Sequence, residues 1–310
     1  MSPLISTFGA ASSFGYGAGG GGSDSVNVKF YGKWHASNGN REGASVADYI
    51  TAASYDHYTA GSTGNLLTTT AEFGRVGYGI LTFKLPKGVY NIEGKGGDCG
   101  AYNGGTSYEN TATLTLTQEE DLMLLIANHG TNTGAGGGTF LVIGTDYTNA
   151  SNTPIIIWGG GASQLQGGDT QHWPGAMSSL VGTPRGYLQS GWGFIDGGSF
   201  STNSSTNTRQ DHFTLGGKGG HSGSNEHGGF GGGATYNGGG GGYWGGISGK
   251  AASYNWYGGA DPGVNSGGGT SYYNANYISN VVTTQNAGYV SSSTGSEVTS
   301  MNGYFGIYTV

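Results

Sequence analysis

Cysteine, proline and charged residues are scarce in this 310-residue chain, and the scarcity of each excludes a class of protein. A single cysteine, Cys99, excludes a disulfide framework and a cysteine-rich zinc module, and predicts a plain buried thiol. Only 6 prolines accompany 68 glycines, which excludes collagen. Charged residues make up 9%, too few for charge-rich disorder. A net charge of −7 without a basic run gives nucleic-acid binding no electrostatic basis.

Long apolar runs are also missing from the sequence. No segment approaches the roughly 18 apolar residues of a transmembrane helix, so we expect no membrane insertion. The N-terminal stretch has neither Lys or Arg nor a continuous apolar core, and is not a standard secretory signal. The composition is nevertheless typical of surface proteins, which favours a virion surface. An extracellular or cell-surface location is the alternative.

Glycine is abundant, most of all at residues 216–246, where it recurs in threes. A period of three fits the extended polyproline-II-type helix, which has no internal hydrogen bonds. Glycine keeps its N–H and lets neighbouring chains approach closely, while buried backbone groups need partners. We therefore expect glycine segments to pack side by side as a bundle of polyglycine-II helices. The alternative, a flexible linker, is opposed by aromatic residues within the run and by strand-like sequence on both sides.

Alternating and fully apolar segments predict an all-β chain whose strands run into glycine segments. Alternation predicts strands at 26–34 and 111–117, and an apolar run predicts a buried strand at 122–127. Further strands are expected at 80–85, 89–93, 139–143, 155–158, 281–284 and 305–310, with a short helix at 44–60, a polar turn at 118–121 and long surface loops at 162–212.

The order of these segments follows a known sequence plan over residues 79–310. Its parts are LTFKLPKGVYNIEGKGG, TATLTLT, LMLLIA, GGGTFLVIGTDY, IIIWGGGA, GGFGGGATYNGGGGGYWGG and GYFGIYTV. The chain resembles the glycine-rich domain family, known from the extracellular ligand-binding region of the anaplastic lymphoma kinase and leukocyte tyrosine kinase receptors and from phage surface proteins.

This resemblance implies a β-sandwich of tumour-necrosis-factor-like, jelly-roll type, interleaved with polyglycine-II helices and carrying long aromatic-bearing loops. The construction is also similar to phage tail-fibre adhesins built on polyglycine helices. Kinase, transmembrane helix and cysteine framework are missing, so receptor signalling does not carry over. We expect an N-terminal anchoring arm at 1–25, which can also be read as a frayed terminus, a small region with at least one strand at 26–78, and the glycine-rich domain at 79–310.

Residues suited to catalysis do not converge in the sequence. The acids at 119–121 fit a solvated hairpin tip, and the histidines are scattered. His221, Glu226 and His227 can offer metal ligands, but no compact zinc spacing is present, and no nucleophile elbow occurs. We expect no enzyme activity, no cofactor and no metal.

Recognition chemistry is what remains. Tyr and Trp give large rigid contact area, with Ser, Gly and Asn as adaptable partners. Such rings can stack on sugars or fill partner pockets, or they can shield the glycine bundle, which is the favoured interpretation for Tyr243 and Trp244. The candidate receptor or glycan contacts are Trp173, Trp192, Tyr236, Tyr243, Trp244, Trp256 and Tyr257.

These features favour a non-enzymatic virion surface protein, such as a phage fibre, tip or decoration protein. A rigid glycine-rich scaffold would present loops to a host surface protein or glycan, residues 1–25 would bind other structural proteins, and copies would assemble as a homo-oligomer. Two alternatives stay open: a secreted or cell-surface adhesin or filament-forming matrix protein, and an enzyme such as a glycan lyase or hydrolase.

Overall fold

The computed structural model describes residues 27–33, 41–43, 45, 73–100, 105–131, 134–162, 194, 212–220, 227–234, 239–245, 268–284 and 301–310. Within these residues the regular secondary structure is β-strand apart from one 3-10 helix, η2 (Phe213–Leu215), which confirms the expected all-β class. The strands are β1 (Asn27–Tyr31), β2 (Gly74–Val76), β3 (Ile80–Leu85), β4 (Gly88–Lys95), β5 (Glu109–Leu116), β6 (Glu120–Leu125), β7 (Thr139–Ile143), β8 (Thr153–Trp158), β9 (Tyr272–Tyr273), β10 (Ile278–Thr284) and β11 (Tyr304–Thr309).

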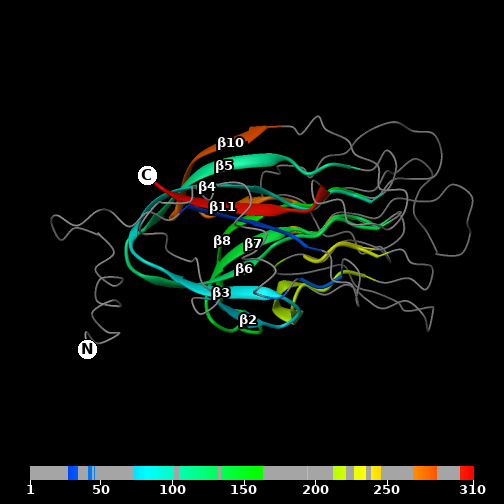
Figure 1. Ribbon diagram of the computed structural model, residues 1–310, viewed down its shortest axis with the longest axis horizontal. Helices are drawn as coiled ribbons and strands as arrows, with labels where there is room; N and C mark the ends of the chain where they lie inside the picture. The colour runs from blue at the N-terminus through cyan, green and yellow to red at the C-terminus, as the bar shows by residue number, and fades with distance from the viewer. Residues whose placement is uncertain are drawn as a thin grey trace, which may run out of the picture.

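The strands form two layers, seen above and below one another in Figure 1. One sheet has five strands in the order β1-β11-β4-β5-β10, and the other has six in the order β2-β3-β6-β7-β8-β9. All paired neighbours are antiparallel. Strands β1 and β2, which precede residue 79, pair with β11 and β3, so they belong to the same two sheets as the rest of the chain.

The burial of each strand follows from its sequence pattern. In β5, Leu114 and Leu116 are buried while the alternating threonines are more exposed, as expected when one face of a strand meets a core. The last four residues of β6 and of β8, Leu122–Leu125 and Ile155–Trp158, are all apolar and buried. The six-stranded sheet is therefore covered on both faces.

Two hydrophobic clusters account for this double burial. The larger cluster lies between the sheets and includes Trp158, Tyr90 and Phe305. The smaller one covers the outer face of the six-stranded sheet, where side chains from β6 and β7 meet rings contributed by η2 and by the glycine segments. Its members are Ile80, Met123, Leu125, Phe140, Val142, Ile157, Phe194, Phe213 and Phe230.

Most of the predicted strands are confirmed, with shifted ends. The strand expected at 26–34 is shorter, and the turn expected at 118–121 is shorter too, because β6 begins at Glu120. Strands β2 and β9 were not predicted, since three and two residues are too short to show a period. The helix expected at 44–60 lies outside the described residues except for Ser45, as do most of the loops expected at 162–212.

One end of the sandwich continues into glycine segments. Short connections join β3 to β4 and β5 to β6 at the other end, whereas β4, β6 and β8 run on into 96–100, 126–131 and 159–162 at the right of Figure 1. Segments 134–138 and 268–271 return from that region into β7 and β9. The glycine segments therefore extend the sheets.

Lateral hydrogen bonds join these glycine segments to one another. The central segment, 134–138, donates hydrogen bonds from four consecutive N–H groups to three different neighbouring segments. Residues 135 and 138 both donate to segment 227–234, so the direction in which the N–H groups point repeats after three residues. The bonds are Ala135 N to Ala234 O (2.9 Å), Gly136 N to Gly161 O (2.9 Å), Gly137 N to Asn128 O (3.1 Å) and Gly138 N to Gly231 O (2.9 Å).

The segments are so close that no side chain fits between them. A Cβ atom added to Gly136 would lie 1.9 Å from Gly97 O, and one added to Gly137 would lie 1.7 Å from Phe230 O. At Gly160 it would lie 2.4 Å from Gly136 O. Glycine is required here by the close approach of neighbouring backbones.

Candidate functional site

Two of the seven aromatic residues predicted to contact a partner lie in the described part of the chain. Tyr243 and Trp244 follow the glycine segment 239–242 and are both half-buried. Trp173, Trp192, Tyr236, Trp256 and Tyr257 lie outside the described residues.

Tyr243 belongs to an aromatic stack beside edge strand β9. The Tyr272 ring is stacked on it, with centroids 4.3 Å apart and an interplanar angle of 13°, and the Phe194 ring lies nearly parallel at 6.5 Å. Trp244 meets Tyr243 edge-on at 5.7 Å. Burial, followed by the neighbouring Tyr272, raises the pKa of the Tyr243 hydroxyl. The ring is thus engaged with the outer hydrophobic cluster.

Backbone bonds hold this stack in place. Tyr243 N donates to Thr270 O at 2.8 Å, and Thr270 N donates to Trp244 O at 3.0 Å. Trp244 N donates to Thr270 Oγ1 at 2.8 Å. Phe194 N donates to Tyr243 O at 3.1 Å. Phe194 and Tyr272 were not singled out from the sequence, where one lies in an irregular polar stretch and the other in a Tyr-Tyr pair without a period.

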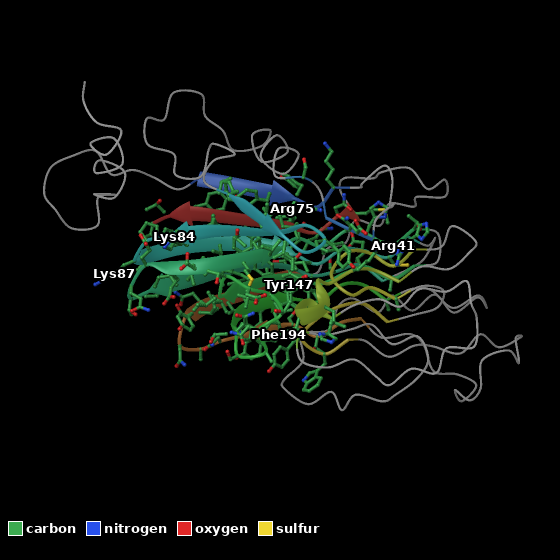
Figure 2. The ribbon with its side chains drawn as sticks, turned by 90° about the horizontal axis from the view of Figure 1, so that it is seen from below. Arg41, Arg75, Lys84, Lys87, Tyr147 and Phe194 are labelled. Atoms are coloured by element: carbon green, nitrogen blue, oxygen red, sulfur yellow. The ribbon has the colours of Figure 1, made fainter. Side chains whose placement is uncertain are left out.

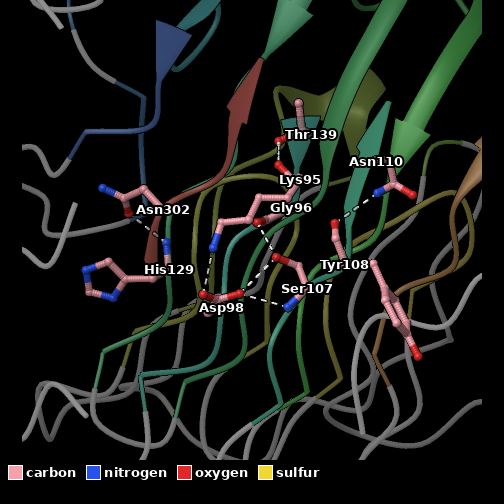
Figure 3. Close-up of polar contacts among 9 residues, drawn as sticks. All are labelled: Lys95, Gly96, Asp98, Ser107, Tyr108, Asn110, His129, Thr139 and Asn302. Atoms are coloured by element: carbon pink, nitrogen blue, oxygen red, sulfur yellow. Dashed lines mark hydrogen bonds and ion pairs between the residues drawn. The ribbon is translucent and has the colours of Figure 1, made fainter. Parts of the chain in front are cut away.

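A group of polar side chains is buried where β4 passes into the glycine region (Figure 3). Lys95 Nζ lies 2.8 Å from Asp98 Oδ2, and both side chains are less than 5% exposed, at 3% and 4%. Ser107 donates to Asp98 Oδ1 from its backbone N at 2.7 Å and from its hydroxyl at 2.8 Å. Thr139 Oγ1 donates to Lys95 O at 2.8 Å. A buried ion pair with these additional bonds fixes the first turn of the glycine segment.

His129 borders this cluster and is buried. Its backbone N donates to Asn302 Oδ1 at 3.0 Å, and Asn302 Nδ2 donates to Gly32 O at 2.7 Å. Its ring Nδ1 contacts Gly130 O. Burial lowers the pKa of His129; the Gly130 carbonyl and Asp98 oppose the shift, and Lys95 adds to it. The backbone N–H of His129, through Asn302, ties 126–131 to the C-terminal segment.

The residues considered for metal binding do not form a site in the described part of the chain. Among those residues, no three His, Cys, Asp or Glu side chains group together as ligands. His227 exchanges hydrogen bonds with Thr131 through its backbone, while His221 and Glu226 lie outside the described residues. Cys99 is buried, as predicted.

The acidic residues at 119–121 lie at an exposed end of the sandwich. Lys84 approaches Glu119 at 3.7 Å and Asp121 at 3.3 Å, and these side chains are 45–65% exposed. Figure 2 shows Lys84 and Lys87 at the end of the molecule opposite Arg41. These acids fit the solvated turn that the sequence predicts, and they lie away from the glycine segments.

No protein-family profile matches the chain, and no curated protein has a significantly similar sequence. Within the described residues, no helix has the length and apolar character needed to cross a membrane.

Proposed function

We propose that the chain is a non-enzymatic surface protein of a virus particle, such as a phage fibre, tip or decoration protein. The sandwich and the glycine segments act as a rigid scaffold, and the loops between glycine segments bind a host surface protein or glycan. Residues 1–25 bind other structural proteins of the particle, and copies of the chain assemble as a homo-oligomer.

One observation carries this proposal: the space between the glycine segments is filled by backbone. At Gly136, Gly160 and Gly229 an added Cβ would meet a carbonyl oxygen at 1.9, 2.4 and 1.9 Å. Where these segments touch there is no room for side chains that could bind a partner, and the dense hydrogen bonds make the region stiff. Recognition then falls to the side-chain-bearing segments that connect the glycine runs.

The glycine segments are proposed to be polyglycine-II helices. Three-residue repetition of the bond direction in 135–138 supports this, because that helix has three residues per turn and directs its backbone groups sideways. The short distances from an added Cβ atom to carbonyl oxygens of neighbouring segments support it further, since such helices pack this closely only when side chains are missing.

A jelly-roll, tumour-necrosis-factor-like topology is proposed for the sandwich. The connections β3 to β4, β5 to β6 and β9 to β10 each pass from one sheet to the other, while β6, β7 and β8 are consecutive neighbours. Shared architecture leaves function to the loops.

Trp173 and Trp192 are the first choice for the contact surface, because they lie in polar stretches and not within a glycine run. Tyr236, Trp256 and Tyr257 are further candidates. Tyr243 and Trp244 rank below them, since the backbone of Tyr243 and its ring serve the aromatic stack.

Location can be tested by immunogold labelling of the culture that produces the chain. Antibodies against the purified protein are expected to label virus particles. Labelling of cell envelopes or extracellular filaments without particles would replace the proposal with the adhesin or matrix alternative. Catalytic turnover of polysaccharides, abolished by one Asp or Glu substitution, would replace both with an enzyme.

The contact residues can be tested by adsorption to host cells. Trp173→Ala and Trp192→Ala are expected to lower adsorption at least tenfold, because a buried aromatic contact contributes more than about 1.4 kcal/mol. Val89→Ala is the matched control, as this side chain is 46% exposed on β4 of the scaffold. Adsorption equal to that of the control would remove both tryptophans from the contact surface.

A further inference from the structure

The ion pair of Lys95 and Asp98 is enclosed by the protein, unlike the surface pair of Lys84 and Asp121. Lys95 Nζ lies 2.8 Å from Asp98 Oδ2, and the two side chains are 3% and 4% exposed. Lys84 Nζ lies 3.3 Å from Asp121 Oδ1, and those side chains are 65% and 45% exposed. Burying two charges is costly, and the cost is relieved when a proton passes from the ammonium group to the carboxylate, because both groups are then neutral.

The neutral amine of Lys95 is a nucleophile held against the carboxyl group of Asp98. Asp98 Cγ is about 1.2 Å from Oδ2, so Lys95 Nζ lies within about 4 Å of this carbon. Lys95 ends β4, and Thr139 Oγ1 donates to its carbonyl oxygen at 2.8 Å, which fixes the backbone at this point. Two reacting groups held together in this way react far faster than the same groups free in solution.

The other carboxyl oxygen of Asp98 is held by two donors. Figure 3 shows Lys95 on one oxygen of the carboxyl group and Ser107 on the other. Ser107 donates to Asp98 Oδ1 from its backbone N at 2.7 Å and from its hydroxyl at 2.8 Å. An attack on Cγ moves negative charge onto Oδ1, and donors at about 2.7–3.1 Å stabilise such charge. Ser107 is fully buried, so water does not compete for these bonds.

We propose that Lys95 and Asp98 form an isopeptide bond, an amide between their side chains, after the chain has folded. The amine nitrogen of Lys95 attacks Cγ of Asp98 and the N–C bond forms. A proton passes from the nitrogen to Oδ2, the Cγ–Oδ2 bond breaks, and one water leaves. One ammonium and one carboxylate thus give one amide and one water, without an oxidant or any other reactant.

The product fits the site that the structure shows. The amide oxygen is the former Oδ1, which keeps both of its Ser107 donors. Two buried charges are replaced by one neutral group, and a covalent link closes the turn by which β4 enters the glycine segment 96–100. This modification goes beyond the proposed surface role and does not depend on it.

Mass spectrometry of the full folded chain tests the proposal. After incubation at neutral pH, the intact mass is expected to lie one water below the mass of the sequence. When the protein is then denatured and treated with an amine-acetylating reagent, Lys95 is expected to stay unmodified while Lys84, the matched control in the exposed pair, reacts. An intact mass equal to that of the sequence, with both lysines acetylated, overturns the proposal.

Fragmentation of the peptide that carries residues 95–98 locates the lost water. Asp98 can also lose water by closing on its own backbone as a succinimide, which has the same mass. An isopeptide bond joins residues 95 and 98, so single backbone cleavages between them are expected to release no fragments. Fragments from these positions, with the mass change confined to Asp98, overturn the proposal.

Ser107→Ala tests the role assigned to the two donors. This variant keeps the backbone N–H and loses the hydroxyl, so loss of water is expected to be at least about tenfold slower than in the unmodified sequence. Circular dichroism that matches that of the parent protein shows that the variant is folded. Bond formation at the same rate in the folded variant overturns the proposed mechanism.

Discussion

Substitution of Gly136 by alanine tests whether bare backbone contact holds the glycine region together. The added Cβ would lie 1.9 Å from Gly97 O, whereas ordinary contact begins at 3.4 Å, so the segment around Gly97 must retreat by about 1.5 Å. That segment is held by two bonds of 2.9 Å, from Gly97 N to Gly137 O and from Gly161 N to Gly97 O. A retreat of this size breaks both.

The expected loss follows from these two bonds. Buried backbone groups left without partners cost about 1–3 kcal/mol each, so we expect Gly136→Ala to lower the free energy of unfolding by at least about 3 kcal/mol. That is a large part of the stability of a typical domain, about 5–15 kcal/mol. Most single substitutions cost less.

Gly138→Ala is the matched control in the same segment. Its added Cβ would lie 3.0 Å from a carbon of the Phe140 ring and 3.1 Å from Gly241 C, which small adjustments relieve. We expect a loss of at most about 1 kcal/mol. Urea unfolding followed by circular dichroism measures both variants. Equal losses for Gly136→Ala and Gly138→Ala would refute the reasoning from close approach.

Three further predictions concern the polar groups. Asp98→Ala removes the carboxylate from a buried ion pair and should cost about 3–5 kcal/mol in urea unfolding, whereas Lys84→Ala, in an exposed pair, should leave the stability nearly unchanged; similar losses would contradict the assigned burial. The pKa of His129 is lowered in the folded state, so below pH 6.5 the unfolded chain binds more protons than the folded chain, and stability should fall as the pH drops below that value. His129→Gln should flatten this pH dependence. If the slope is the same in the variant, the pH dependence comes from another group. The Tyr308 hydroxyl donates to Glu93 Oε1 at 2.6 Å, and burial together with this bond raises its pKa above 10.0. Stability should therefore decline as the pH rises beyond 10, and it should decline less in Tyr308→Phe. Equal declines in both proteins would exclude this tyrosine as the cause.

Strands were predictable from the sequence wherever side chains alternate or form an apolar run. The pattern TATLTLT gives β5, and the run LMLLIA gives β6 to within two residues at each end. Strands β2 and β9 could not be found in this way, because they are too short to show an alternation of side chains. Each is a strand only because it pairs with a neighbour, β2 with β3 and β9 with β8. Their short sequences reveal nothing about that neighbour.

The partners within the glycine region were not predictable. A glycine has no side chain whose polarity could report which neighbour it faces, so the sequence cannot show that 134–138 lies between 97, 128, 161 and 229–234. The pair Lys95 and Asp98 was also missed, since its burial depends on segments far away in the chain. Of the candidate contact residues, Tyr243 and Trp244 alone have described surroundings, and there the ring packing on Tyr272 comes from tertiary structure.

The crowding around Gly136 and its neighbours separates two kinds of position along the chain. At Gly136, Gly137 and Gly160 an added methyl group would lie within 2.4 Å of a carbonyl oxygen, whereas at Gly138 its nearest contact would be 3.0 Å away. We therefore expect substitutions that add a side chain to be least tolerated at Gly136, Gly137 and Gly160, where the neighbouring backbone would have to move.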